Sequence, residues 1–167
     1  MRILAICGSL QEKSSNLTLL RLAIGSAPSG VEIALYDGLR HLPHFNPDLA
    51  HDDVDDTPRA VAELRRAVAS ADALLIATPE YGHSLPGSLK NAIDWLIGTG
   101  ELERKLVAIT CAVPALERGR LGLAALRTTL GAVSARVAFA EPIARGPNFE
   151  AQILQMLELL IDAASSR

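Results

Sequence analysis

Three short, unbroken runs of apolar residues constrain the fold of this chain most strongly. They are residues 3–6, 73–77 and 106–109. A continuous apolar run of this length is typical of a strand covered on both faces, because alternation is expected only where one face meets water. Longer stretches with a helical period near 3.6 follow the runs. Strands that alternate with helices predict an α/β fold, in which a parallel sheet lies between two layers of helices.

Charges in two further runs predict the order of the strands. Residues 31–36 and 133–140 tend to alternate, and they contain Glu32 and Arg136, as edge strands can. Strands are therefore expected at 2–7, 31–36, 73–78, 106–111 and 133–140, with the first, third and fourth in the centre. The order 2-1-3-4-5 satisfies this expectation. It is the order of a flavodoxin-like, doubly wound, five-stranded parallel sheet, in which ligands bind at the carboxyl ends of strands one and three.

Five helices are expected to cover the two faces of this sheet. Their apolar faces comprise Leu20, Ala23, Ile24 and Ala27; Val61, Leu64 and Val68; Leu85, Leu89, Ile93 and Leu96; residues 121–130; and Ile153, Leu157, Leu160, Ile161 and Ala164. No repeat or long linker interrupts the pattern, so residues 1–167 are expected to form a single domain. No apolar run is long enough to cross a bilayer, and residues 1–7 are interpreted as a strand rather than a signal peptide.

The overall charge and the two cysteines limit the classes of partner and the compartment. Sixteen basic and 19 acidic residues give a net charge of −3, which argues against a general nucleic-acid binder. We expect neither a nucleic-acid nor a membrane partner. Cys7 and Cys111 lie in apolar runs, which predicts two buried, reduced thiols in a cytoplasmic protein.

A cluster of histidines and aspartates follows the second predicted strand. Its members are His41, His44, His51, Asp52, Asp53, Asp55 and Asp56. Their spacing matches no metal-ligand geometry, and three prolines interrupt the segment. We therefore predict a solvated acidic loop and no metal site.

The loop after the first strand, residues 8–16, is suited to holding a phosphate. Ser9, Ser14, Ser15 and Asn16 surround the expected start of the first helix, where unpaired N–H groups attract an anion. Simple N-capping by Ser14 or Ser15 is an equally good explanation of the serines. The loop lacks the glycine spacing of a Walker or dinucleotide-binding motif. Cys7-x5-Lys13-Ser14 has the spacing of low-molecular-weight tyrosine phosphatases, but Lys13 stands where their bidentate arginine is needed.

The loop after the third strand, residues 78–87, is suited to bordering a flat ring. Thr78-Pro79 keeps the chain extended beyond the strand, and Tyr81 lies among free peptide groups. Ser84 is expected to cap the following helix. A well-capped turn from strand to helix, without any ligand, explains the same residues. Spacing alone leaves both explanations open.

Residues 78–96, which read TPEYGHSLPGSLKNAIDWL, resemble the signature of the NAD(P)H-dependent FMN reductase-like family. Residues 8–16 and the segment after the second strand, Tyr36-Asp37 to Asp48-Leu49, are also similar to that family. The resemblance implies that the FMN phosphate is held by Ser9, Gln11, Ser14, Ser15 and Asn16. It implies that Pro79, Glu80, Tyr81 and Gly82 line the isoalloxazine, mostly through backbone, with His83 and Ser84 close by.

Two departures from the family pattern bear on how FMN is held. Many members carry Arg at the position of Gln11, near the phosphate, and many carry Asn at the position of Gly82. Loss of a charged partner weakens binding by about 1–3 kcal/mol. The resemblance therefore predicts looser retention of FMN here.

The resemblance implies an oxidoreductase that moves electrons from NADH or NADPH through FMN to a small acceptor. Quinones, azo compounds, metal oxyanions and free flavin are all candidate acceptors, and ping-pong kinetics are expected. The alternatives are a non-enzymatic electron carrier or redox sensor and, as a minority hypothesis, a phosphatase that uses Cys7. A homodimer or a dimer-based tetramer is implied, with Trp95-Leu96-Ile97 as one candidate contact surface. A core role for Trp95 explains that residue at least as well.

Overall fold

The computed structural model describes residues 1–50 and 57–166. The strands are β1 Arg2–Cys7, β2 Glu32–Tyr36, β3 Ala73–Ala77, β4 Leu106–Thr110, β5 Ala112–Val113, β6 Arg136–Ala140 and β7 Ile143–Ala144. The helices are α1 Ser15–Gly25, α2 Arg59–Ala69, α3 Gly87–Asp94, α4 Arg120–Ala132 and α5 Phe149–Ser165, with short 3-10 turns η1 Leu39–His41 and η2 Pro47–Leu49. The predicted elements are thus all present, with ends that differ by a few residues.

The five long strands form one parallel sheet in the order β2-β1-β3-β4-β6. This is the predicted order, because β6 is the fifth long strand along the chain. The strands that contain Glu32 and Arg136 lie at the two edges, where a charged side chain reaches water without crossing a core. The three continuously apolar strands occupy the centre and are buried along almost all of their length. The prediction of the fold class is confirmed.

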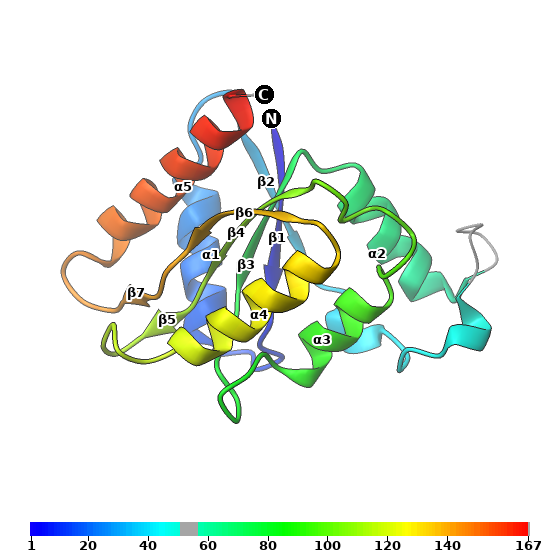
Figure 1. The fold of residues 1–167 in the computed structure, drawn as a ribbon. Coiled ribbons are helices and arrows are strands. Elements are labelled where there is room, and N and C mark those ends of the chain that lie inside the picture. Colours follow the sequence, from blue (N-terminus) through cyan, green and yellow to red (C-terminus); the bar gives the residue numbers. More distant parts are fainter. Residues whose placement is uncertain (51–56, 167) are drawn as a thin grey trace.

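The alternation of side chains along the central strands divides the interior into two cores. On one face, the sheet packs against α1 and α5 through residues such as Ile3, Leu75 and Leu157. On the other face, α2, α3 and α4 pack against residues that include Leu4 and Ile76. Figure 1 shows these two helix layers on opposite sides of the sheet. Because the helices cover the two faces, the end of the sheet at which the strands finish, called here its carboxyl edge, stays open.

A second, two-stranded parallel sheet was not predicted. Strand β5 begins two residues after β4 ends, and it pairs with β7 through Ala112–Ile143 and Val113–Ala144. Each strand has only two residues, which is too short for a hydrophobic period to be visible in the sequence. Their pairing continues the chain past the carboxyl edge of the main sheet and brings residues 143–145 toward α1 (Figure 1).

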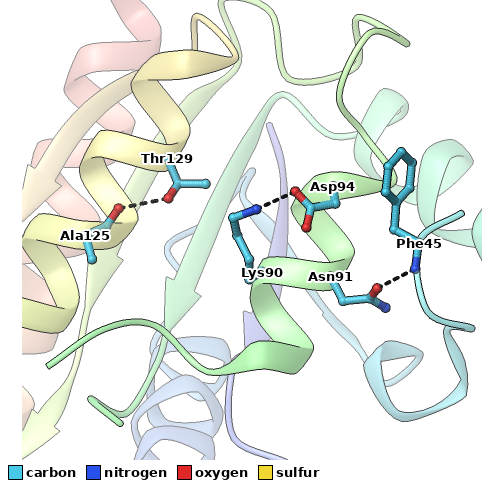
Figure 2. A network of polar contacts seen from close by, with 6 residues as sticks. All are labelled: Phe45, Lys90, Asn91, Asp94, Ala125 and Thr129. Atoms are coloured by element: carbon cyan, nitrogen blue, oxygen red, sulfur yellow. Dashed lines mark hydrogen bonds and ion pairs between the residues drawn. The ribbon is translucent and has the colours of Figure 1, made fainter. Parts of the chain in front are cut away.

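Hydrogen bonds from one side chain of helix α3 connect the helix to the segment after β2. Asn91 Oδ1 accepts a hydrogen bond from the Phe45 N–H at 2.8 Å, and Asn91 Nδ2 donates to the Pro43 carbonyl at 2.9 Å. Figure 2 shows Asn91 pointing toward this segment, while Lys90 and Asp94 pair on another side of the helix at 2.6 Å. Asn91 therefore serves the fold, whereas Lys90 and Asp94 form a partly exposed pair within the helix.

Of the candidate contact surface Trp95-Leu96-Ile97, only Ile97 is exposed, and the alternative of a core role for Trp95 is confirmed. Trp95 is 2% exposed and Leu96 is 4% exposed, whereas Ile97 is 51% exposed. Trp95 Nε1 donates to the Pro43 carbonyl at 2.8 Å, and the indole packs edge-on against Phe45. A large aromatic ring whose one polar atom finds a buried acceptor gains more from the core than from a surface.

Among the residues that the structure describes, we find neither a membrane-spanning helix nor a cluster of metal ligands. Within residues 1–50 and 57–166, no helix combines the length and apolarity needed to cross a membrane. Over the same residues, no group of three or more histidine, cysteine or acidic side chains is arranged to hold a metal ion. Of the predicted acidic loop, His51 and its four aspartates lie outside the described residues.

Candidate functional site

The loops after β1 and β3 are joined directly at the carboxyl edge of the sheet. The Gly8 N–H donates to the Ala77 carbonyl at 2.8 Å, which continues the ladder between the two strands into the loops. Ser88 in the first turn of α3 donates from Oγ to the Gly8 carbonyl at 3.5 Å. A Cβ at Gly8 would lie 2.3 Å from Thr78 Oγ1 and 2.8 Å from Thr78 Cβ. Only glycine allows the two loops to approach this closely, as the order of the strands requires.

The loop after β1 holds its serines in part for structure. Ser14 is the N-cap of α1, and its Oγ accepts from the Asn16 N–H at 3.2 Å. Ser9 Oγ accepts from the Gln11 N–H at 3.3 Å. Asn16 is buried and its Oδ1 accepts from the Ala112 N–H at 2.8 Å. The capping explanation is therefore correct for Ser14, and the hydroxyl hydrogens of Ser9 and Ser15 stay available as donors.

The same loop leaves anion-binding groups open. Ser15 is half-buried in the first turn of α1, and Gln11 is exposed. Within the described residues, no hydrogen-bond acceptor is found for the N–H groups of Ser15 and Leu17. N–H groups at a helix start carry partial positive charge and bind phosphate without further help. Ser14, Ser15 and Asn16, which are predicted to surround a phosphate, thus lie together at the start of α1, and Ser9 lies in the loop before it.

Cys7 is poorly suited to act as a nucleophile. Burial raises the pKa of its thiol, and the opposing hydrogen bonds from the Ser9 backbone and the Ser14 side chain, with the charge of Arg21, do not offset this. A catalytic cysteine needs the opposite shift, because the thiolate is the attacking form. Together with the lysine at position 13, this argues against the phosphatase hypothesis.

The loop after β3 forms a tight turn that projects from the edge of the sheet. Tyr81 and Ser84 exchange two backbone hydrogen bonds of 3.0 Å each. Gly82 and His83 between them both have positive φ, 56° and 61°, as in a type I′ turn. Tyr81 at 56% and its two successors are exposed to solvent. Space is open around Gly82, where an added Cβ meets nothing within 4 Å.

The prediction that Ser84 caps α3 is wrong. The cap position is Pro86, and no side chain caps the helix. Ser84 is instead committed through its backbone to the turn with Tyr81. A proline before the first helical residue is pre-set in the extended conformation that a cap needs, which the sequence pattern of serine followed by apolar residues concealed.

The loop after β4 is the third wall of this edge, and Glu80 connects it to the turn. Glu80 Oε2 accepts from the Gly122 N–H in the first turn of α4 at 2.8 Å. Helix α4 has glycine at its own cap, Gly119, so the carboxylate from the neighbouring loop replaces the missing cap. The side chain of Glu80 is therefore directed to α4, and its peptide faces the edge. This agrees with the prediction that residues 79–82 act mostly through backbone, which stays a prediction for any ligand.

A separate hollow of about 430 Å³ lies beside the first loop on the side of β2. Its lining includes Gln11, Arg21, Tyr36 and Arg40, and no residue of the turn at 81–84. This hollow extends from the predicted phosphate loop toward β2 and away from the turn at 81–84, which is predicted to border the ring.

Comparison with known proteins assigns the chain to a family. The sequence profile described as NADPH-dependent FMN reductase matches residues 1–145, which include all three loops. The chain belongs to this FMN reductase family. Among curated relatives, an NAD(P)H-dependent FMN reductase of Pseudomonas aeruginosa is 39% identical over 124 residues, 74% of this chain and 64% of that protein. The quinone reductase of Escherichia coli is 33% identical over 96 residues, 58% of this chain and 50% of that protein.

A solved structure supports the same assignment. FerB, a flavoenzyme NAD(P)H:(acceptor) oxidoreductase from Paracoccus denitrificans, superposes with a TM-score of 0.80 at 25% identity, covering 96% of this chain and 97% of FerB. The chain spans about half to two thirds of the length of the curated relatives named above. The family and the flavodoxin-like fold predicted from the sequence are confirmed.

The donor groups of this FMN reductase family member fit a flavin mononucleotide. An FMN needs N–H and O–H donors for a dianionic phosphate at one end and backbone polar groups with open space for a flat ring at the other. The first loop offers the former, and the turn at 81–84 offers the latter. The two are held together through Gly8.

Arg145 is a residue at this site for which the sequence suggested another role. With Arg118 and Arg120, it is a candidate in the sequence for contacting the 2′-phosphate that distinguishes NADPH from NADH. The structure places its Nη1 3.4 Å from Ser15 Oγ, at the start of α1. No local signal links residues 130 positions apart, and the strand pair that joins them is only two residues long.

Replacing Gly8 with alanine is expected to destabilise the protein by about 1–3 kcal/mol, the usual cost of overpacking. The new Cβ would overlap Thr78 Oγ1 and force the two loops apart. Any flavin that spans both loops should bind more weakly as well. Chemical denaturation and FMN titration measure the two effects. Gly25→Ala in α1 is the control, since its Cβ meets nothing within 4 Å; equal behaviour of the two variants would contradict the steric role of Gly8.

The Cys111 thiol is expected to make the free energy of unfolding fall as the pH becomes alkaline. Burial, followed by the charge of Glu80, raises the pKa of its thiol from 9.0 to about 12. The native state then keeps a proton that the unfolded chain loses. The stabilisation is complete below pH 9 and is lost as pH rises from 9 through about 12.

Cys111→Ala is therefore expected to flatten the fall of the unfolding free energy over this alkaline range. Denaturation curves at several pH values measure the slope, which is independent of any constant cost of the substitution. Burial, followed by the charge of Glu63, also raises the pKa of Tyr36 to about 12. Tyr36 contributes equally to the pH dependence of both proteins. Parallel pH profiles for the two proteins would show that Cys111 does not titrate differently on unfolding.

Proposed function

We propose that this protein binds FMN at the carboxyl edge of its sheet and uses it as an NAD(P)H-dependent oxidoreductase. The observation that carries the proposal is the direct junction of two loops through Gly8. One offers unpaired N–H groups at a helix start, and the other an exposed backbone turn. When bound, FMN supplies hydride acceptance from NADH or NADPH and electron donation to a small acceptor. Quinones are the favoured acceptor class, because the E. coli relative is named a quinone reductase.

The chain's own residues would bind and orient the cofactor. The N–H groups of the first turn of α1, with Ser9, Ser14 and Ser15 hydroxyls, would hold the phosphate. Asn16 would act indirectly, since its Oδ1 already holds the Ala112 N–H. Peptides of residues 79–83 would border the ring, and the N–H groups of Gly82 and His83 would offer dipoles to negative charge that develops on it. No side chain needs to act as a general acid or base.

A visible absorption spectrum of the purified protein with and without added FMN tests the proposal. Bound flavin that bleaches anaerobically on addition of NADPH or NADH supports an oxidoreductase. Flavin that binds but is not reduced by either nucleotide would support the carrier or redox-sensor hypothesis instead. No binding at high FMN concentration would overturn the proposal. Steady-state kinetics with a benzoquinone should give parallel double-reciprocal lines, and intersecting lines would exclude a ping-pong mechanism.

We further propose that residues 1–167 act as one flavin-binding domain of a cytoplasmic homodimer or dimer-based tetramer. Exposed apolar side chains gather near the turn and the third wall: Tyr81, Leu116 and Leu121. Covering them in a dimer would also shield one side of the flavin edge. The two cysteines are free, which suits a reducing compartment. Sedimentation velocity with and without FMN tests the assembly.

A further inference from the structure

Arg145 is held beside the start of α1 by a series of specific contacts. Its own N–H donates to the Val113 carbonyl at 2.8 Å, which extends the β5–β7 ladder to this residue. Next along β5, the Ala112 N–H donates to Asn16 Oδ1 in the first turn of α1 at 2.8 Å. On the other side, Gln152 Nε2 donates to the Ala144 carbonyl at 3.2 Å. The backbone of Arg145 is thus tied to both α1 and α5.

The guanidinium is directed to the phosphate loop and has no acidic partner there. Nη1 donates to Ser15 Oγ at 3.4 Å, a long bond to a neutral group. No carboxylate lies within ion-pair distance of Arg145 in residues 1–50 and 57–166. A guanidinium with five donors and one neutral contact retains most of its capacity to bind an anion.

The lack of a positive charge at position 11 gives the anion-binding capacity of Arg145 its importance. Residue 11 of the phosphate loop is the neutral Gln11, and the charges of the neighbouring Glu12 and Lys13 are of opposite sign. A phosphate dianion bound by N–H groups and hydroxyls alone would lack a full positive charge at that place. Arg145 approaches the same helix start from a distant segment of the chain.

We propose that Arg145 binds the phosphate of FMN and replaces the positive charge that Gln11 lacks. The proposal rests on the proposed function, since it assigns a residue to the same flavin site. Bidentate, charge-assisted hydrogen bonds from the guanidinium would reach two phosphate oxygens, with Ser15 between the arginine and the helix N–H groups. The expected selectivity is for the phosphate and not for the ring.

Flavin binding to Arg145→Gln, measured by fluorescence quenching, tests the role without relying on turnover. The Kd for FMN should rise about ten- to hundredfold, because a charged hydrogen-bond partner is lost. The Kd for riboflavin, which has the ring but no phosphate, should change less than about threefold. Arg136→Gln is the charge-matched control at the opposite end of the sheet, and it should leave both constants unchanged. Adding Gln11→Arg to Arg145→Gln should restore FMN affinity.

Three results would overturn the proposal. Equal losses for FMN and riboflavin would show that Arg145 only supports the loop. Unchanged FMN affinity with a raised KM for NADPH but not NADH would assign Arg145 to the nucleotide 2′-phosphate. A selective loss of FMN in Lys13→Gln but not in Arg145→Gln would place the compensating charge on the loop itself. Wild-type protein is titrated first: if it binds neither flavin, the proposed function fails, whereas a failure of Arg145 alone leaves that function standing.

Discussion

Replacing Trp95 with alanine is expected to lower the free energy of unfolding by about 3–5 kcal/mol. The indole is 2% exposed and lies in the core between α2, α3 and α4. Its removal leaves a cavity against Phe45 and takes away the Nε1 donor to Pro43. For a chain of 167 residues, this corresponds to a Tm lowered by about 6–20 °C. Thermal melting followed by circular dichroism measures it.

Ile97 provides the matched control two positions further on. It is 51% exposed, so Ile97→Ala should change stability by less than about 0.5 kcal/mol. Trp95→Phe keeps most of the apolar volume and loses the donor, and it should fall between the two. If Trp95→Ala were as mild as Ile97→Ala, the indole would not be the anchor of the segment after β2.

Replacing Glu101 with alanine is expected to cost about 3 kcal/mol, because it removes a carboxylate from a buried guanidinium. Arg65 Nε and Glu101 Oε1 are 2.7 Å apart, with side chains only 9% and 11% exposed. Thr99 donates to the other carboxylate oxygen. The pair ties α2 to the connection between α3 and β4. Urea denaturation at neutral pH measures the loss.

Two comparisons separate burial of the pair from charge in general. Glu63→Ala breaks a pair of similar length, Arg59–Glu63 at 2.9 Å, whose side chains are 92% and 54% exposed. That change should cost about 0.3 kcal/mol. The double replacement Arg65→Met with Glu101→Leu should recover much of the stability, since neither member of this pair then carries a charge. A Glu101→Ala protein as stable as Glu63→Ala would contradict this explanation.

Much of the architecture could be predicted from local pattern, and the misses have physical reasons. Continuous apolar runs identified the central strands, and Glu32 and Arg136 identified the edges. Strands β5 and β7 were missed because two residues carry no period. The cap of α3 was misplaced because Ser84 is a favourable cap residue that the turn with Tyr81 uses otherwise. The sequence left both a core role and a contact role open for Trp95, because it does not show that the Pro43 carbonyl accepts from the indole.

The candidate site, like the fold, could be predicted from the sequence only in part. The types and positions of the loop residues were visible in the sequence, because strand order alone brings both loops to one edge. Their individual tasks depended on packing: Ser14 caps α1, Asn16 holds Ala112, and Glu80 caps α4.

The class of fold, the order of the strands and the family could be predicted from the sequence, because each follows from local periodicity and motifs. The need for a glycine at position 8 and the position of Arg145 beside Ser15 became visible only in the folded chain. Both facts depend on contacts between segments far apart in the chain. Such contacts arise from the register of paired strands and the packing of helices on them, which no local pattern encodes.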